Sequence, residues 1–388
     1  MRILLASTGS GSRGGGEIFL DYLGKGLADR GHDVLMWVPN HTRMDELAQR
    51  CSRFARILRS DYRNTYDYLG RSLSSCFNWN VSRRIAREWK DLRPDVIHIN
   101  KQNLEDGLDL LRAARLSALP TVCTIHLTQT ADYLSARVAF LRDWIARWQL
   151  SRYKGTFVAV QDRRCAALRE FLAGHGRTKT IFNGVPVVDP VQSRSIREAK
   201  RKELGIMDGE FLVLGVGRLV QQKRPLQFLR LAKELYSRFP NMRFLWVGDG
   251  DLTKQWQNKI RQEQLDTIVS CAGWQTDVTP FLLASDLLLH VAQFEGLPLV
   301  VIEAMAAQLA CAITRDLASE VPLFNESNVI FADDTEQLGK RLESRLSLMR
   351  IAQNGRRLFE DRFSVNIMAQ SYEELYLNVA RERLFEVQ

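Results

Sequence analysis

The sequence has few features of a protein held together by disulfides or by metal ions. Its cysteines lie far apart, and no two of them form a Cys-x-x-Cys pair, so neither a disulfide framework nor a zinc site is expected. Reduced, mostly buried thiols in a cytoplasmic protein are the expectation for such spacing. The residues concerned are Cys51, Cys76, Cys123, Cys165, Cys271 and Cys311.

Long apolar runs are also missing. No segment approaches the roughly 20 apolar residues that a membrane-spanning helix needs. The apolar start of the chain, residues 1–7, is too short for the core of a secretory signal and is typical of a first strand. We therefore expect a cytoplasmic protein, with contact at the inner face of the cytoplasmic membrane left open.

One common phosphate-binding motif, the P-loop Gly-Lys-Ser/Thr, is absent. The loop at residues 9–14 matches the spacing Gly-x-Gly-x-x-Gly, but we do not interpret it as a dinucleotide-binding fingerprint. A glycine run, Gly14, Gly15 and Gly16, instead separates the strand predicted at residues 2–7 from a helical pattern that starts near Ile18. Glycine lets a backbone approach a ligand closely, and a helix N-terminus favours an anion, so this loop is a candidate phosphate site.

Charge is unevenly distributed along the chain. Of 54 basic and 45 acidic residues, residues 1–187 hold 29 and 18, giving +11, whereas residues 188–388 hold 25 and 27, giving −2. The asymmetry predicts that the first half meets an anionic partner. No recognised nucleic-acid-binding motif accompanies the charge, so nucleic acid is not the expected partner.

The length of 388 residues suits two domains. Predicted strands alternate with predicted helices in both halves, which indicates an α/β protein with two doubly wound parallel sheets. Two arginine-rich stretches are interpreted differently. The apolar spacing at residues 45–60 predicts a helix, whereas the charged run at residues 193–202, after Pro186 and Pro190, suits a linker.

The most informative stretch is residues 294–306, which reads as a turn followed by a helix. Gly296 loosens the backbone, and Pro298 suits the first helical position because its missing N–H costs nothing there. The N-terminus of such a helix favours a phosphate. Glu295 and Glu303 would repel a phosphate but accept hydrogen bonds from sugar hydroxyls. The stretch therefore predicts a nucleotide-sugar ligand.

The same residues resemble the donor motif of the family 4 retaining glycosyltransferases. Glu295 is followed by glycine, and Glu303, after seven intervening residues, is followed by Ala-Met-Ala. The resemblance implies the GT-B fold, in which two Rossmann-like domains face each other across a cleft, and a reaction without a metal ion. It also implies donor contacts from Gly296, Leu297, Leu299, Val300 and Glu303.

Further motifs occur in the order that this resemblance requires. Gly-Arg-Leu at 217–219 is followed by Lys223, which puts two cations at a strand end and a helix start, where they could neutralise a departing diphosphate. In the family, Arg218 and Lys223 would hold the donor pyrophosphate, and the glycines of the run at 14–16 would face it. The glycine that usually follows the lysine is Arg224 here.

His126 follows the strand predicted at residues 121–125, on the sheet edge where open α/β sheets bind ligands. The family has a histidine here that faces the donor sugar, usually followed by aspartate, whereas this chain has Leu127. An ordinary structural histidine is the alternative.

Two other features allow two interpretations each. Asp249 and Asp251 could form a metal motif, but the glycines around them suit the family's Gly-x-Gly turn, which puts Gly248 beside the base. Trp274 could stack on that base or pack as an ordinary tryptophan.

The helix predicted at residues 137–152 also allows two interpretations. Its apolar face suits either a membrane interface or the core. That face comprises Val138, Leu141, Trp144, Ile145 and Trp148, with Phe140 at its edge.

Together these observations predict three segments. Residues 1–185 form an acceptor-side domain, 186–363 a nucleotide-sugar domain, and 364–388 a final helix that returns to the first domain. The predicted function is transfer of a sugar, with retained configuration, from a UDP- or GDP-linked donor to a hydroxyl of an anionic or lipid-linked glycan in cell-envelope synthesis. No further cofactor is expected. Glu295, Arg218, Lys223 and His126 are the predicted catalytic residues.

Two other functions remain as alternatives. A GT-B nucleotide-sugar epimerase would bind the same ligand but would need further acid and base residues at the sugar. A sugar-nucleotide-binding protein without turnover would be expected to lack one of the central glutamates or cations, and all are present.

Overall fold

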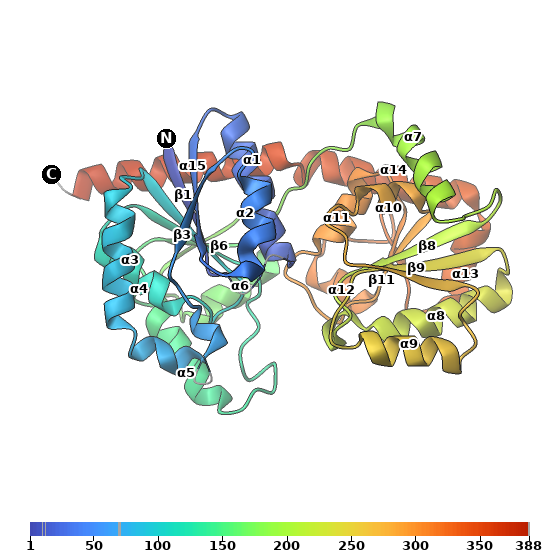
Figure 1. The fold of residues 1–388 in the computed structure, drawn as a ribbon, viewed down its shortest axis with the longest axis horizontal. Coiled ribbons are helices and arrows are strands. Elements are labelled where there is room, and N and C mark those ends of the chain that lie inside the picture. Colours follow the sequence, from blue (N-terminus) through green and yellow to red (C-terminus); the bar gives the residue numbers. More distant parts are fainter. Residues whose placement is uncertain (10, 12, 69–70, 387–388) are drawn as a thin grey trace. The chain divides into compact units, whose positions relative to one another are not determined.

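The computed structural model describes residues 1–9, 11, 13–68 and 71–386. The chain divides into two compact units. The first consists of Met1–Gly184 together with Val365–Gln388, and the second of Val185–Ser364. Each unit is a parallel sheet with helices on both faces (Figure 1).

The first unit contains a seven-stranded parallel sheet in the order β3-β2-β1-β4-β5-β6-β7, counted over the described residues. Its strands are β1 (Arg2–Ser7), β2 (Asp33–Pro39), β3 (Arg56–Ser60), β4 (Val96–Lys101), β5 (Thr121–Ile125), β6 (Thr156–Ala159) and β7 (Arg177–Thr180). Its α-helices are α1 (Gly15–Asp29), α2 (Asp45–Cys51), α3 (Trp79–Asp91), α4 (Leu108–Ser117), α5 (Ala139–Leu150), α6 (Asp162–Phe171) and α15 (Val365–Glu386).

Successive residues of β1 explain how this sheet is covered on both faces. Leu4 packs in one core cluster with residues of α3 and α4, whereas Ile3 and Leu5 pack in another with residues of α1, α2 and α15. Neighbouring side chains of a strand point to opposite faces, so a strand covered on both sides must be apolar throughout.

The second unit contains a six-stranded parallel sheet in the order β10-β9-β8-β11-β12-β13. Its strands are β8 (Phe211–Val216), β9 (Met242–Val247), β10 (Val269–Gly273), β11 (Leu287–His290), β12 (Cys311–Ile313) and β13 (Ile330–Phe331). Its helices are α7 (Pro190–Glu203), η4 (Gln221–Lys223), α8 (Pro225–Arg238), α9 (Thr253–Gln262), α10 (Thr279–Ala284), α11 (Leu299–Ala306), α12 (Arg315–Glu320), α13 (Thr335–Glu343) and α14 (Arg345–Arg362).

Both sheets reverse their strand order at one point, and open α/β sheets bind ligands at the carboxyl ends of the strands beside such a point. In the first unit the reversal falls at β1, between β2 and β4. In the second it falls at β8, between β9 and β11. The predicted site residues follow β1, β5, β8 and β11 and therefore lie at these two edges.

The prediction of one helix over residues 45–60 is wrong. Helix α2 ends at Cys51, and residues 56–60 form β3 at the edge of the sheet. Ile57 and Leu58 are half-buried between the exposed side chains of Arg56 and Arg59, and β3 pairs in parallel with β2. Backbone pairing with a neighbouring strand therefore outweighed a helical apolar spacing that was fortuitous.

The charged run at residues 193–202 is also not an open linker, because it lies within helix α7. Asp189 caps the helix by accepting a hydrogen bond from the Val191 N–H at 2.9 Å, and Pro190 occupies the first helical position. Arg197 and Arg201 both bind the Asp286 carboxylate, at 2.5 and 3.1 Å. The charges thus attach α7 to its own unit.

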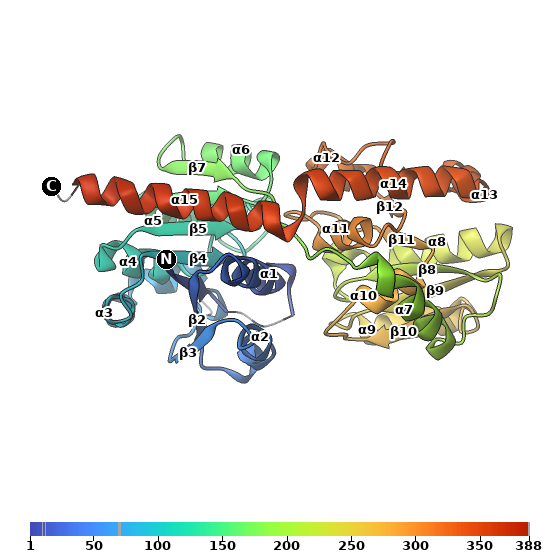
Figure 2. The same ribbon diagram turned by 90° about the horizontal axis from the view of Figure 1, so that it is seen from above.

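Helix α15, the last segment of the chain, packs within the first unit, alongside α1 and the strands β4 and β5 (Figure 2). Tyr376 Oη lies 2.5 Å from His98 Nδ1, and Tyr372 Oη lies 2.7 Å from Thr124 Oγ1. His98 Nε2 in turn lies 2.8 Å from Thr124 Oγ1, so one buried polar network joins the helix to both strands.

The six cysteines are all free thiols; only Cys271 is exposed, and Cys76 is half-buried. Among the described residues, no helix is both long enough and apolar enough to cross a membrane.

Candidate active site

The loops that follow β8 and β11 bring two predicted site residues together. Lys223, at the end of η4, donates a hydrogen bond from Nζ to Glu295 Oε1 and forms an ion pair with it. The side chains are 18% and 13% exposed, so water screens this pair weakly. The sequence predicted both residues but not their contact.

Neighbouring residues hold this pair in place. The Gln222 carbonyl accepts a hydrogen bond from the Gln293 N–H at 2.8 Å, and Gln222 Nε2 donates to the Phe294 carbonyl at 2.9 Å. The Lys223 stem lies over Gly217, where an added Cβ would stand 3.3 Å from Cδ and Cε. A side chain at position 217 would therefore push the lysine away.

Glu295 is held as an anion. Its burial alone would raise its pKa, but Lys223, together with His290, outweighs the burial and lowers the pKa of Glu295 to about 2. His290 Nε2 lies 3.5 Å from Glu295 Oε1. Burial lowers the pKa of His290, although Glu295 acts in the opposite direction. A carboxylate fixed in this way can accept hydrogen bonds from hydroxyl groups.

Helix α11 begins one residue later than predicted, with Pro298 at the position before its first turn. The Pro298 carbonyl accepts the Val301 N–H at 3.1 Å, whereas the first N–H groups of a helix have no partner within it. The predicted donor contacts Gly296, Leu297, Leu299 and Val300 all lie at this end of the helix. Glu303 lies one turn further along and is half-buried.

Arg218 comes directly after Gly217 at the carboxyl end of β8, and its side chain is exposed. It therefore differs from Lys223, which is enclosed and paired with Glu295. Both cations belong to the stretch between β8 and α8.

Gly248 has a specific role in the loop after β9. A Cβ at this position would lie 2.2 Å from the Gly217 carbonyl oxygen, so only glycine permits this backbone approach. The Gly248 N–H donates to the Gly273 carbonyl at 2.7 Å and is already engaged within the fold. Trp274, the next predicted base contact, is half-buried after Gly273, which has φ +66°.

Asp249 and Asp251 lie in the same loop. Among the described residues, no group of three or more His, Cys, Asp and Glu side chains is placed to hold a metal ion.

In the first unit, His126 is fixed by Asn100. Asn100 Nδ2 donates to the Gly16 carbonyl at 2.9 Å, which turns Asn100 Oδ1 toward His126 Nε2 at 2.8 Å. Because the amide oxygen can only accept, Nε2 carries the ring proton, and Nδ1 is left as an acceptor.

His126 stays neutral at physiological pH. Burial lowers its pKa to about 4, although Asp106 acts in the opposite direction. The ring packs edge-on against Phe19, with centroids 4.9 Å apart. The residue can therefore accept a hydrogen bond from a ligand but does not supply a positive charge.

The glycine run fits closely against its own surroundings. Helix α1 begins at Gly15, with Gly14 in the preceding position. An added Cβ would lie 2.4 Å from Glu17 Oε2 at Gly14 and 1.9 Å from Gln102 Oε1 at Gly16. Ser10 and Ser12 of the same loop lie outside the described residues.

Two family models match the chain. Residues 13–188 match the model of glycosyltransferase family 4, and residues 196–356 match the model of the group 1 glycosyl transferases. The chain belongs to glycosyltransferase family 4. Its fold is GT-B, as the resemblance implied.

Relatives of this glycosyltransferase include an Escherichia coli enzyme, UDP-Gal:alpha-D-GlcNAc-diphosphoundecaprenol alpha-1,3-galactosyltransferase, which is 25% identical over 64% of this chain and 68% of its own. The alpha-monoglucosyldiacylglycerol synthase of Acholeplasma laidlawii is 22% identical over 76% of this chain and 78% of its own. The solved structure of Anabaena Alr3699/HepE with UDP and glucose superposes with a TM-score of 0.75 at 20% identity, covering 96% of this chain and 98% of that one. At that identity the likeness shows the fold.

Three residues that contact predicted site residues or their loops were not predicted from the sequence: His290, Asn100 and Gln222. His290 ends the apolar strand β11, and Asn100 lies at the carboxyl end of β4. The rule that singled out His126, a polar residue where a buried strand ends, would also have found these two. No comparable signal marks Gln222.

Proposed function

We propose that this glycosyltransferase moves a sugar from a UDP- or GDP-linked donor to a hydroxyl group, with retained configuration and without a metal ion. The observation that carries the proposal is Glu295, an anion held between Lys223 and His290 immediately before the N-terminus of α11. This arrangement offers a carboxylate to a polyol next to a positive helix end for a phosphate.

The proposed roles follow from charge. Arg218, Lys223 and the first N–H groups of α11 stabilise the diphosphate as its negative charge grows, and so supply the positive charge that a metal ion provides in other transferases. Glu295 binds hydroxyls of the transferred sugar and stabilises positive charge at its anomeric carbon.

Two roles rest on the family resemblance. Glu303, set one turn back from the phosphate end of α11, binds the ribose. His126, as a neutral acceptor, binds a hydroxyl of the donor sugar.

The acceptor is proposed to be anionic or lipid-linked, in the synthesis of a cell-envelope polysaccharide or glycolipid. The names of two relatives support this: one acts on a sugar linked to diphosphoundecaprenol, and another synthesises a glycosylated diacylglycerol. The excess of basic residues in the first half of the chain also favours an anionic acceptor.

An exposed apolar surface supports contact with the inner face of the cytoplasmic membrane. Helix α5 buries Ile145, while Phe140 is 84% exposed and Trp144 55% exposed. The apolar face predicted for this helix is thus only partly buried, and the side chains of its first turns are exposed to solvent. The exposed apolar side chains of α5 and the loop before it are Tyr133, Leu134, Val138, Phe140, Leu141 and Trp144.

The proposal is tested with a panel of UDP- and GDP-sugars, by measuring nucleoside diphosphate release with and without an undecaprenyl-diphosphate-linked sugar, in buffer containing EDTA. We expect release that depends on the acceptor and on one donor, and NMR of the product should show the donor's anomeric configuration. Conversion of the donor sugar to its epimer without acceptor would instead indicate an epimerase. Binding of a donor without any turnover across a broad acceptor panel would contradict the transferase assignment.

A further inference from the structure

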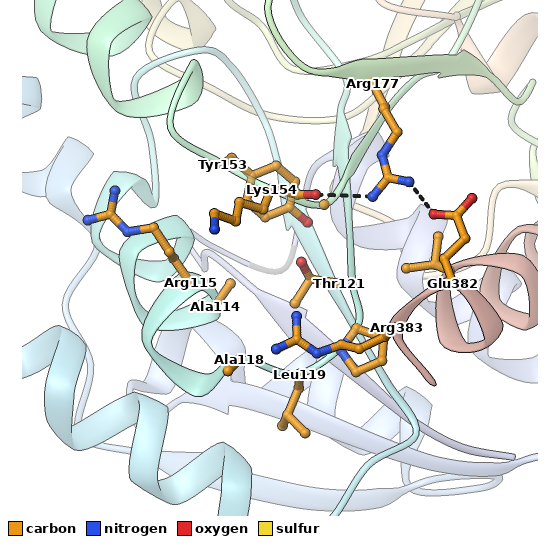
Figure 3. Close-up of a pocket in the computed structure, with 13 residues that line it drawn as sticks. Ala114, Arg115, Ala118, Leu119, Thr121, Tyr153, Lys154, Arg177, Glu382 and Arg383 are labelled. Atoms are coloured by element: carbon orange, nitrogen blue, oxygen red, sulfur yellow. Dashed lines mark hydrogen bonds and ion pairs between the residues drawn. The ribbon is translucent and has the colours of Figure 1, made fainter. Parts of the chain in front are cut away.

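A cavity lies within the first unit, at the edge of its sheet opposite to His126. It has a volume of about 280 Å³ and opens at the amino ends of three strands (Figure 3). Thr121 is the first residue of β5, Gly155 directly precedes β6, and Arg177 is the first residue of β7. Helices α4 and α15 complete its wall.

The lining is strongly basic. Four cations, Arg115, Lys154, Arg177 and Arg383, face a single carboxylate, Glu382. Arg177 pairs with Glu382 and donates to the Lys154 carbonyl at 3.2 Å. Arg115, Lys154 and Arg383 have no ion-pair partner in the described part of the chain. Three unpaired cations around one cavity repel one another, and a bound anion would relieve that repulsion.

Polar groups lie in the deeper part of the cavity. The Tyr153 side chain is 4% exposed, and its hydroxyl finds no hydrogen-bond partner among the described residues. Burial raises the pKa of Tyr153, and the Thr121 hydroxyl lies close enough to lower it, but the two hydroxyls do not meet the distance and angle of a hydrogen bond. A buried hydroxyl without a hydrogen-bond partner costs free energy. A ligand that accepts a hydrogen bond from this hydroxyl would therefore be stabilised.

Gly155 keeps this polar space open. A Cβ at that position would stand 2.4 Å from Tyr153 Oη and 2.5 Å from Thr121 Oγ1. The cavity therefore combines three unpaired cations at its rim with two hydroxyl donors inside, which matches a multiply charged oxyanion.

We propose that this cavity binds a phosphate or diphosphate group and is an anion site separate from the donor site. A phosphoryl group suits it better than a carboxylate, because it carries more charge and more acceptor oxygens. The group belongs either to a soluble phosphorylated molecule or to the head of an anionic lipid. Because Arg383 comes from α15 and Arg115 from α4, the bound anion would link these two helices within the first unit.

The proposal is tested on the full chain with inorganic pyrophosphate, by calorimetry at low salt. Lys223→Ala is used as the background in every variant, because it weakens pyrophosphate binding at the donor site. In that background, Arg115→Ala with Arg383→Ala should weaken the remaining binding at least tenfold, and Tyr153→Phe should weaken it several-fold. Arg83→Ala, which removes an exposed arginine of α3, is the matched control and should change little.

A second arm uses vesicles of phosphatidylglycerol and of phosphatidylcholine. If pyrophosphate binding in solution depends on Arg115 and Arg383, the site takes a soluble phosphate. If only phosphatidylglycerol binding depends on them, the site takes a lipid phosphate. The proposal is overturned if the double substitution, in protein that is folded by circular dichroism, changes neither kind of binding more than Arg83→Ala does.

Discussion

Lys223 and Glu295 form a largely buried ion pair between the loops that follow β8 and β11. A cation assigned to the diphosphate and an anion assigned to the sugar are therefore in direct contact. When a diphosphate binds, Lys223 would be shared between two anions, which places positive charge where the bond to the leaving group breaks.

Removal of Lys223 should lower turnover and also change the dependence of activity on pH. We expect Lys223→Ala to lower kcat by about 10²-fold, the scale of one preorganised electrostatic contact. The pKa of Glu295 should rise from about 2, since its burial, which raises the pKa, is then opposed only by His290. Residual activity should therefore be lost at a higher pH than the activity of the native enzyme.

Steady-state rates between pH 4 and 8 provide the measurement. The control is Lys233→Ala, which removes an exposed lysine paired with Glu263 on the surface of the same unit. Near-normal turnover in folded Lys223→Ala would exclude the proposed role.

His126 should remain neutral far below the pH at which a free histidine is protonated. Its pKa of about 4 lies below the value of about 6.5 in an unfolded chain. The resulting stability is therefore fully present above pH 6.5 and is lost as the pH falls toward 4. At pH 5 the loss amounts to about 2 kcal/mol.

NMR of the His126 Cε1–H group, assigned with a His126→Gln sample, measures this directly, with a histidine-containing peptide as reference. A midpoint above pH 6 for His126 would refute the prediction.

Arg224 should be a site where glycine stabilises the protein. It has φ +48° and ψ +50°, a left-handed conformation that costs an ordinary residue about 1 kcal/mol or more. Its contact with Asp316 is 3.6 Å long and involves a largely exposed carboxylate, so it contributes little.

Arg224→Gly is therefore expected to raise the free energy of unfolding by about 1 kcal/mol, whereas Arg224→Ala, which keeps the strain, should not. Urea denaturation followed by circular dichroism compares the two. Equal stabilities of both variants would show that the backbone strain is not relieved.

The apolar surface around α5 should bind membranes. Phe140→Ser combined with Trp144→Ser should weaken binding to anionic vesicles at least tenfold, because exposed aromatic side chains at an interface supply much of the binding free energy. Binding of the native chain should also fall as salt is added. The control is Leu346→Ser, at an equally exposed apolar position of the second unit. If the double variant sediments with vesicles as the native chain does, this surface does not contact the membrane.

The fold class followed from the sequence because parallel strands buried on both faces are long apolar runs. Residues 2–7 and 121–125 were predicted with the bounds that the structure shows. Elements at the edge of a sheet were harder to predict. Strand β3 has arginine at two of its five positions and therefore has no long apolar run. Helix α7 was missed because its stability depends on Asp286, more than 80 residues away.

The candidate site was predicted in part for a similar reason. Local motifs identified Arg218, Lys223, Glu295 and His126 as candidates, because each stands beside a strand end or a helix start. The contact between Lys223 and Glu295, which lie 72 positions apart, depends on two strands being neighbours in the sheet. The spacing of residues along the sequence does not show which strands are neighbours in the sheet.

The position of α15 also bears on how the chain is made. The first unit needs Tyr372 and Tyr376 for the buried network at His98 and Thr124, yet these residues are synthesised after the whole of the second unit. The second unit is one continuous segment and can close as soon as residue 364 has left the ribosome. The unit whose strands are synthesised first is thus the one that finishes folding second, and loss of α15 would expose the core that this helix covers in the first unit.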